Sequence, residues 1–154
     1  QTTQPVTLEH VKECALILQH TFRNKDANER RQAEQALNKL SDDPDRFMEI
    51  LILLIIHNES NGTLTASKAQ TYISRSLELL DQTKDAAATY LSLMLKTKRF
   101  GEDVSSEQRY AKASLLFQAM IQEHLKLSYR IHLGACLTQL LLSKGCNSFA
   151  ISDF

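Results

Sequence analysis

The stretch "ERRQAEQALNKLSDDPDRF", which covers residues 29–47, describes the end of one helix, a tight turn and the start of another helix. Before the turn, apolar residues recur at the spacing of one helix face, at Ala33, Ala36, Leu37 and Leu40. In the turn, Asp43 can cap a helix whose first residue is Pro44, because the missing N–H of proline is not needed at that position. The stretch therefore predicts two helices joined by a short corner.

Capping signals and apolar periodicity extend this pattern along the chain. Helix starts are predicted after Thr7, at Asp26 with Glu29 at capping-box spacing, at Asp43, at Asp81 or Thr83, at Ser105 with Gln108, and at Ser128. A further helix is predicted over about 65–80, after a loop at 58–63. The apolar run at 47–56 is rich enough in β-branched residues to suggest a strand. Its start at Pro44 and its helical flanks favour a helix packed on more than one side. The sequence thus predicts about seven helices and no strand.

Composition limits the class of protein. The chain has 154 residues, 43% of them hydrophobic, which suits one domain or a fragment of a longer protein with a buried core. Its 18 basic and 18 acidic residues cancel, so no overall field attracts nucleic acid or anionic lipid. With only 4 Gly, 2 Pro and no Trp, the composition favours helices over turn-rich β folds.

The cysteines and the longest apolar run indicate the compartment. Cys14, Cys136 and Cys146 form no Cys-x-x-Cys pair, and an odd number of cysteines suits a reducing environment. The apolar run at 47–56 is shorter than the roughly 20 residues that cross a bilayer. The chain is therefore expected to be soluble and intracellular, without membrane insertion.

Side chains that could carry catalysis or bind metal are scattered. None of the five histidines belongs to a His-Glu-x-x-His motif or lies one turn from a carboxylate and a second histidine. His124 lies on an apolar stripe and is predicted to be a core histidine, while Cys14 and Cys136 are predicted to be packing residues. Cys146 is the one candidate exposed thiol, with a bystander role expected. No phosphate-binding loop or nucleophile elbow occurs, so neither an enzyme nor a cofactor or metal site is predicted.

Two basic clusters raise the question of nucleic acid. They consist of Arg30 and Arg31, and of Lys96, Lys98 and Arg99. Neither is interleaved with aromatic residues that could stack on bases. A solvated helix face and a helix C-terminus explain them, so direct nucleic-acid binding is not expected.

The spacing of the helices suggests repeats. The first two predicted helices form a hairpin over residues 8–40, and a third begins close behind it, which matches helical repeats of roughly 40 residues. The predicted fold class is an all-α solenoid of antiparallel hairpins, with a plain helical bundle as the alternative. Repeat 1 covers about 7–41, repeat 2 about 43–99 with an extra helix at about 65–80, and repeat 3 about 105–145. An apolar tail with Phe149, Ile151 and Phe154 argues for a missing partner or a longer chain.

The opening stretch also resembles the N-terminal signature of the importin-β superfamily of nuclear transport receptors. The first repeat of that family carries an Arg-x-x-Ala-Glu-x-x-Leu-x-x-Leu helix followed by a Pro-x-x-Phe-like start of the next helix. Here these places are occupied by Arg30, Ala33, Glu34, Leu37, Leu40, Pro44 and Phe47. "KDAAATYLSLMLK" is similar to the second helix of the family's second repeat, and "SEQRYAKASLLFQAM" with "SYRIHLGACLTQLL" is similar to its third repeat. The final "SDF" resembles the start of the segment before the next repeat.

The resemblance implies an N-terminal domain of HEAT repeats whose inner helices bind the GTP form of the small GTPase Ran. Cargo proteins and nucleoporins would bind through later repeats, and the protein would shuttle between cytoplasm and nucleus. On the inner helices, the positions off the buried stripes are Arg31, Glu34, Gln35, Asn38, Asp85, Thr89, Ser92, Lys96, Arg130, His132 and Gln139. These are the candidate Ran-binding residues.

Two departures from the family pattern qualify the resemblance. Ser92 and Leu93 stand where the family has Lys-Asn, with Lys96 one turn on as a possible substitute, and the helix at about 65–80 has no counterpart. Arg30 and Glu34 are equally well explained as members of ion pairs.

A helical-repeat scaffold unrelated to transport, such as a coat-adaptor or phosphatase-scaffold subunit, is the alternative function. Importin and exportin cannot be separated in these repeats.

Overall fold

The computed structural model describes residues 5–23, 26–57, 66–96 and 104–142, with only the backbone described at 22–23 and 66–80. Within these ranges every regular element is a helix. The six helices are α1 (Leu8–Arg23), α2 (Ala27–Leu40), α3 (Pro44–Ile56), α4 (Ala66–Lys96), α5 (Ser106–Met120) and α6 (Leu127–Leu141). The all-helical prediction is confirmed for this part of the chain. The predictions for the loop at 58–63, for Lys98, Arg99 and Cys146, and for the tail lie outside the described residues.

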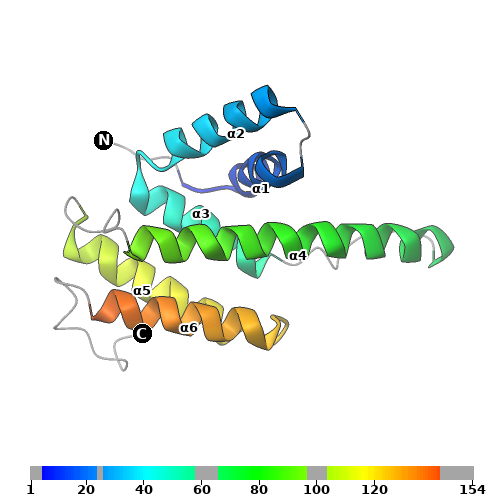
Figure 1. Ribbon diagram of the computed structural model, residues 1–154. Helices are drawn as coiled ribbons and strands as arrows, with labels where there is room; N and C mark the ends of the chain where they lie inside the picture. The colour runs from blue at the N-terminus through cyan, green and yellow to red at the C-terminus, as the bar shows by residue number, and fades with distance from the viewer. Residues whose placement is uncertain (1–4, 24–25, 58–65, 97–103, 143–154) are drawn as a thin grey trace.

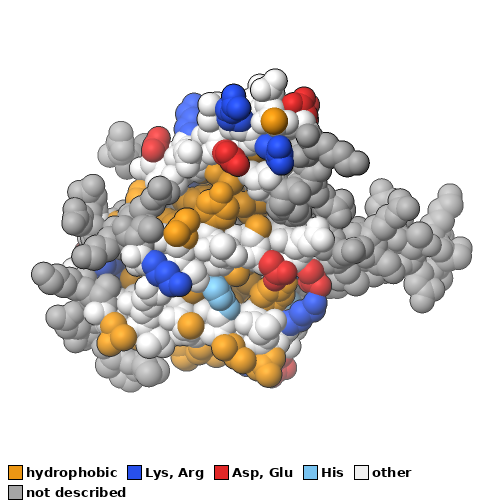
Figure 2. Space-filling model, in the orientation of Figure 1, with side chains coloured by type: hydrophobic (Ala, Val, Ile, Leu, Met, Phe, Trp, Pro, Cys, Tyr) orange, Lys and Arg blue, Asp and Glu red, His pale blue; other side chains and the backbone are white. Residues whose placement is uncertain are grey.

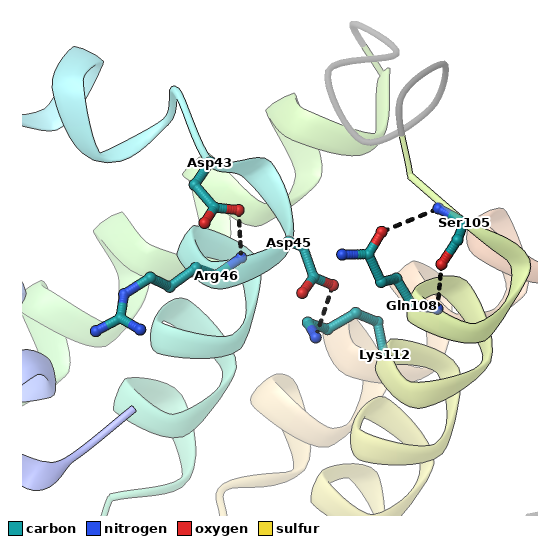
Figure 3. A network of polar contacts seen from close by, with 6 residues as sticks. All are labelled: Asp43, Asp45, Arg46, Ser105, Gln108 and Lys112. Atoms are coloured by element: carbon teal, nitrogen blue, oxygen red, sulfur yellow. Dashed lines mark hydrogen bonds and ion pairs between the residues drawn. The ribbon is translucent and has the colours of Figure 1, made fainter. Parts of the chain in front are cut away.

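Three of the predicted helix starts have the expected caps. The Asp26 side chain accepts a hydrogen bond from the N–H of Asn28 at 2.9 Å. Asp43 accepts from the N–H of Arg46, and Pro44 is the first residue of α3. Ser105 and Gln108 form the reciprocal capping box that opens α5 (Figure 3). Each cap satisfies N–H groups that the first helical turn leaves without a partner inside the helix.

The prediction of two separate helices at about 65–80 and after Asp81 is wrong. One helix, α4, runs through this region for 31 residues, about 46 Å, and crosses the molecule from side to side (Figure 1). Instead of starting a helix, Thr83 is fully buried inside α4, where its hydroxyl accepts a hydrogen bond from Nε2 of Gln19 on α1. The second predicted repeat therefore contains α3 and one long helix, α4, which replaces the predicted extra helix at about 65–80 and the predicted helix after it.

Two further predictions near α6 are also wrong. Ser128 does not cap the helix, because α6 begins at Leu127 with Lys126 as the N-cap residue and no side-chain hydrogen bond. His124 is exposed and lies in the turn after α5 rather than in the core, with Nε2 3.0 Å from the carbonyl oxygen of Ile56. The helix ends at Met120, so the apolar stripe predicted to include His124 stops before that residue.

The core is centred on α3, as its apolar sequence predicts. Its fully buried side chains include Phe47, Met48, Leu51, Ile52, Leu54 and Ile55. The helix packs against α1, α4 and α5, which explains why it is apolar on more than one side. Burying one such side chain contributes about 1.5–3 kcal/mol, so α3 is a major source of hydrophobic stabilisation.

The helices pack in consecutive pairs. α1 packs with α2, α3 with α4, and α5 with α6; α1, α3 and α5 also pack in series, and α4 packs on α6. This arrangement is consistent with a helical repeat. The first pair is set differently from the others, because α1 as well as α3 packs on α4, while α2 packs chiefly on α1 (Figure 1).

Candidate partner-binding surface

The four candidate residues on α2 lie together on its exposed side. Arg31, Glu34, Gln35 and Asn38 are all exposed, whereas Ala33 and Leu37 on the opposite side are buried. Their spacing of three or four residues places them on one face of the helix. The helical geometry predicted from the sequence is thus confirmed for this group, while its binding role stays a prediction.

On α4 the candidate residues differ in exposure. Asp85, Thr89 and Lys96 are exposed, but Ser92 is half-buried. The Thr89 hydroxyl donates a hydrogen bond to the carbonyl oxygen of Asp85 at 2.9 Å, which holds its side chain against the helix. Leu93, which stands where the resembled family has a polar residue, is 44% exposed. Over residues 81–96, where the side chains of α4 are described, the accessible face therefore combines both signs of charge with the exposed Leu93.

Ser92 and His132 join α4 to α6. The Ser92 Oγ atom lies 3.0 Å from Nε2 of His132, and the same nitrogen lies 2.9 Å from the carbonyl oxygen of Ala88. A carbonyl oxygen can only accept, so Nε2 carries a proton in this arrangement. The contact makes His132 a polar connection between the two helices, with Cys136 Sγ 4.0 Å from Ser92 Oγ at its edge.

The neighbouring end of the α4–α6 contact is held by Tyr129. Its hydroxyl donates to the carbonyl oxygen of Asp81 at 3.2 Å. Burial raises the pKa of this phenol well above its usual value, and the neighbouring carboxylates of Asp85 and Asp81 raise it further. Tyr129 therefore remains a neutral hydrogen-bond donor in this contact.

The remaining α6 candidates are half-buried. Arg130 donates from Nε to the carbonyl oxygen of Met120 at 2.8 Å, so it closes the turn between α5 and α6. Gln139 lies further along the helix and is also half-buried. The structure gives Arg130 and His132 structural contacts that the sequence did not predict.

The candidate residues form two groups. Those on α4 and α6 are adjacent, because the two helices pack on each other. Those on α2 are set apart, and Figure 2 shows hydrophobic side chains exposed between α2 and α4. The inner surface predicted from the resemblance is therefore divided by an apolar strip.

Buried charges on α5 were missed by the sequence analysis. Lys112 is 5% exposed and its Nζ atom lies 2.8 Å from Oδ1 of Asp45 on α3 (Figure 3). This ion pair connects the first turn of α3 to the middle of α5. Arg109 and Lys112 share a helix face with the apolar residues Ala113 and Leu116. This shared face is the sequence pattern from which the burial of the two charged residues could have been predicted.

The two described cysteines are buried, as predicted. Cys14 is fully buried, and its burial, with a smaller effect from the charge of Glu13, raises the pKa of its thiol to about 12. Burial raises the pKa of Cys136 to about 11, while the hydrogen bond with Ser92 acts in the opposite direction. Neither thiol is therefore a nucleophile at neutral pH.

Among the described residues, no three His, Cys, Asp or Glu side chains are grouped as a metal site requires. No helix in this part of the chain combines the length and hydrophobicity needed to cross a membrane. No protein-family model matches the sequence, and neither a curated protein nor a solved structure matches it.

Proposed function

We propose that this chain is the N-terminal part of an importin-β-like nuclear transport receptor, an α-solenoid of HEAT-like repeats that binds Ran in its GTP form. The observation that carries the proposal is the packing of three consecutive helix pairs, with α1, α3 and α5 in series and α4 on α6. Such stacking is how repeat proteins bury one pair on the next. The opening motif supplies the link to this family.

The motif residues have roles in the structure that suit a repeat corner. Ala33, Leu37 and Phe47 are buried, and Pro44 starts α3 behind the Asp43 cap. These residues set the angle between the first two helix pairs. Glu34 is exposed on the face of α2 that also carries Arg31, Gln35 and Asn38, which is the side where we expect a partner to bind, while Arg30 is exposed in register with Ala33 and Leu37.

The exposed members of the candidate set are the ones we assign to Ran. They are Arg31, Glu34, Gln35 and Asn38 on α2, and Asp85, Thr89 and Lys96 on α4. Ser92 and His132 are already hydrogen-bonded to each other, so their contribution is to hold α4 against α6. Under this proposal the protein shuttles between cytoplasm and nucleus and binds cargo and nucleoporins through other repeats.

The test is a binding measurement with full-length protein and purified Ran loaded with GTP or with GDP. We expect binding to the GTP form and little to the GDP form. The triple variant Arg31→Ala, Gln35→Ala, Asn38→Ala should weaken binding at least about tenfold, which corresponds to about 1.4 kcal/mol. Its matched control is Lys12→Ala with Glu13→Ala, two exposed residues on α1. Absent or nucleotide-independent binding would refute the proposal and favour a helical-repeat scaffold.

A further inference from the structure

Three apolar side chains form a row on α4 that the candidate set does not include. Leu93 is 44% exposed, and Ala86 and Tyr90 are half-buried. At 100° per residue, the three positions lie within about 60° of one another around the helix. A single hydrophobic residue on a surface needs no explanation, but a row on one accessible helix face is a candidate interaction surface.

The row lies on the side of α4 that points away from α6. Ser92 marks the side that faces α6, because its Oγ atom lies 3.0 Å from Nε2 of His132. Thr83 marks the side that faces α1, because its hydroxyl accepts a hydrogen bond from Gln19. Leu93 is about 100° around the helix from Ser92, in the direction of Thr83. Since α2 and α6 lie on opposite sides of α4 in Figure 1, the row belongs to the apolar strip that Figure 2 shows between α2 and α4.

Tyr90 in this row is held in a fixed orientation by the core. Its ring meets that of Phe47 edge to face, at a centroid distance of 6.3 Å and an interplanar angle of 69°. Phe47 is itself 1% exposed. A tyrosine that is already fixed loses little conformational entropy when a partner covers it, and tyrosine is enriched among the residues that dominate binding energy. Tyr90 therefore has the properties of a binding anchor.

Polar candidate residues lie on both sides of the row. Thr89 and Lys96 are exposed beside Leu93 on α4, and the exposed face of α2 with Gln35 and Asn38 lies across the strip. A partner that contacts both groups must also cover the row, because the row lies between them. An apolar centre with a polar rim is the usual arrangement of a protein–protein interface.

We propose that the partner bound by α2 and α4 places an exposed apolar side chain against Leu93 and Tyr90, and that these two residues are the anchor of the interface. The inference rests on the proposed function, because it concerns the same partner. The charged candidate residues then form the rim, where each exposed contact contributes little binding energy. The partner is thus a protein whose contact surface carries an apolar residue among polar ones.

Binding of GTP-loaded Ran by the full-length protein tests the anchor. Leu93→Ser should weaken binding at least about tenfold, because the apolar side chain of the partner loses its contact. Leu93→Met keeps an apolar side chain of similar volume and should retain the affinity within about threefold. Leu16→Ser on α1, where the wild-type leucine is 56% exposed, is the matched control and should bind as the wild type does.

The salt dependence of binding separates an apolar anchor from a charged contact. The factor lost in Leu93→Ser should be the same at about 0.05 M and about 0.5 M salt, because no charge is removed. The factor lost in Lys96→Ala should shrink as salt is added, because the ions screen an exposed charge. A Leu93→Ser effect that disappears at high salt would contradict an apolar contact.

The remaining outcomes distinguish the anchor from the proposed function. If the wild type binds GTP-loaded Ran and Leu93→Ser binds as well as Leu16→Ser, the anchor is refuted and the proposed function stands. Absence of binding by the wild type refutes both. A melting temperature of Leu93→Ser well below that of Leu16→Ser would show that another part of the chain covers Leu93, and would also overturn the proposal.

Discussion

Replacing Lys112 by Met should destabilise this protein substantially more than an equivalent change on its surface. The substitution keeps most of the side-chain length and removes the ammonium group. Lys112 pairs with Asp45 across the contact between α3 and α5, and its side chain is 6% exposed while that of Asp45 is 25% exposed. Methionine and lysine have similar helix propensities, so the effect on α5 itself is small.

The magnitude follows from the charge left behind. Removing one partner of a fully buried ion pair costs about 3–5 kcal/mol, because the other charge stays uncompensated in the interior. Asp45 retains contact with solvent, so we discount this range to about 2 kcal/mol. For a chain of this length, such a loss lowers the melting temperature by about 4–8 °C.

The ion pair between Lys126 and Asp81 is the matched control. Its side chains are 60% and 37% exposed, and Lys126→Met should therefore cost no more than about 1 kcal/mol. Urea unfolding followed by circular dichroism gives both free energies. The double variant Asp45→Asn with Lys112→Met should recover part of the loss, since no unpaired charge remains. Equal costs at the two sites, or no recovery in the double variant, would refute the reasoning.

Two further predictions concern the thiols and the helix caps. The pKa values of Cys14 and Cys136 are raised to about 12 and about 11 in the folded chain from 9.0, so the unfolded chain loses protons first and stability should fall as pH rises above 9. Each thiol contributes up to about 1.4 kcal/mol per pH unit to this loss of stability. Urea unfolding at several pH values should show that the free energy of unfolding falls less steeply with pH when both cysteines are replaced by Ala. An unchanged slope would contradict the raised pKa values. Ser105→Ala should cost about 1 kcal/mol because it removes a capping box, whereas Ser128→Ala should be nearly neutral because that residue caps nothing. Thermal unfolding of the two serine variants compares them directly, and similar losses would contradict the assigned helix starts.

The sequence predicted those parts of the fold that depend on local chemistry. The helix starts at Asp26, Asp43 and Ser105 agree with the structure because each places a side-chain acceptor next to unpaired N–H groups. The central position of α3 was also predictable, because a helix that is apolar on several sides must be covered on several sides. Neither inference needs to know which helices are neighbours.

The candidate surface was predicted less completely, because exposure on a helix depends on what packs beside it. The α2 residues form one exposed face, as expected, since that helix packs chiefly on α1. Ser92 and His132 have the same helical register as exposed positions, but the approach of α6 to α4 joins them in a hydrogen bond. For the same reason Lys112 is buried on α5: the position of Asp45 on α3 supplies a partner that the local sequence does not reveal.

The error in α4 shows why a capping residue alone does not start a helix. Asp43 and Thr83 have comparable capping chemistry, but the chain breaks only at the first. Pro44 has no N–H for a bond to the preceding turn, so the earlier helix cannot continue through it. Around Thr83 the sequence has neither Pro nor Gly. Because the helix continues, the Thr83 hydroxyl is buried against Gln19, and Lys84 Nζ lies 2.9 Å from the carbonyl oxygen of His57. These tertiary contacts favour one helix, so a residue that can cap a helix does not by itself mark a helix start.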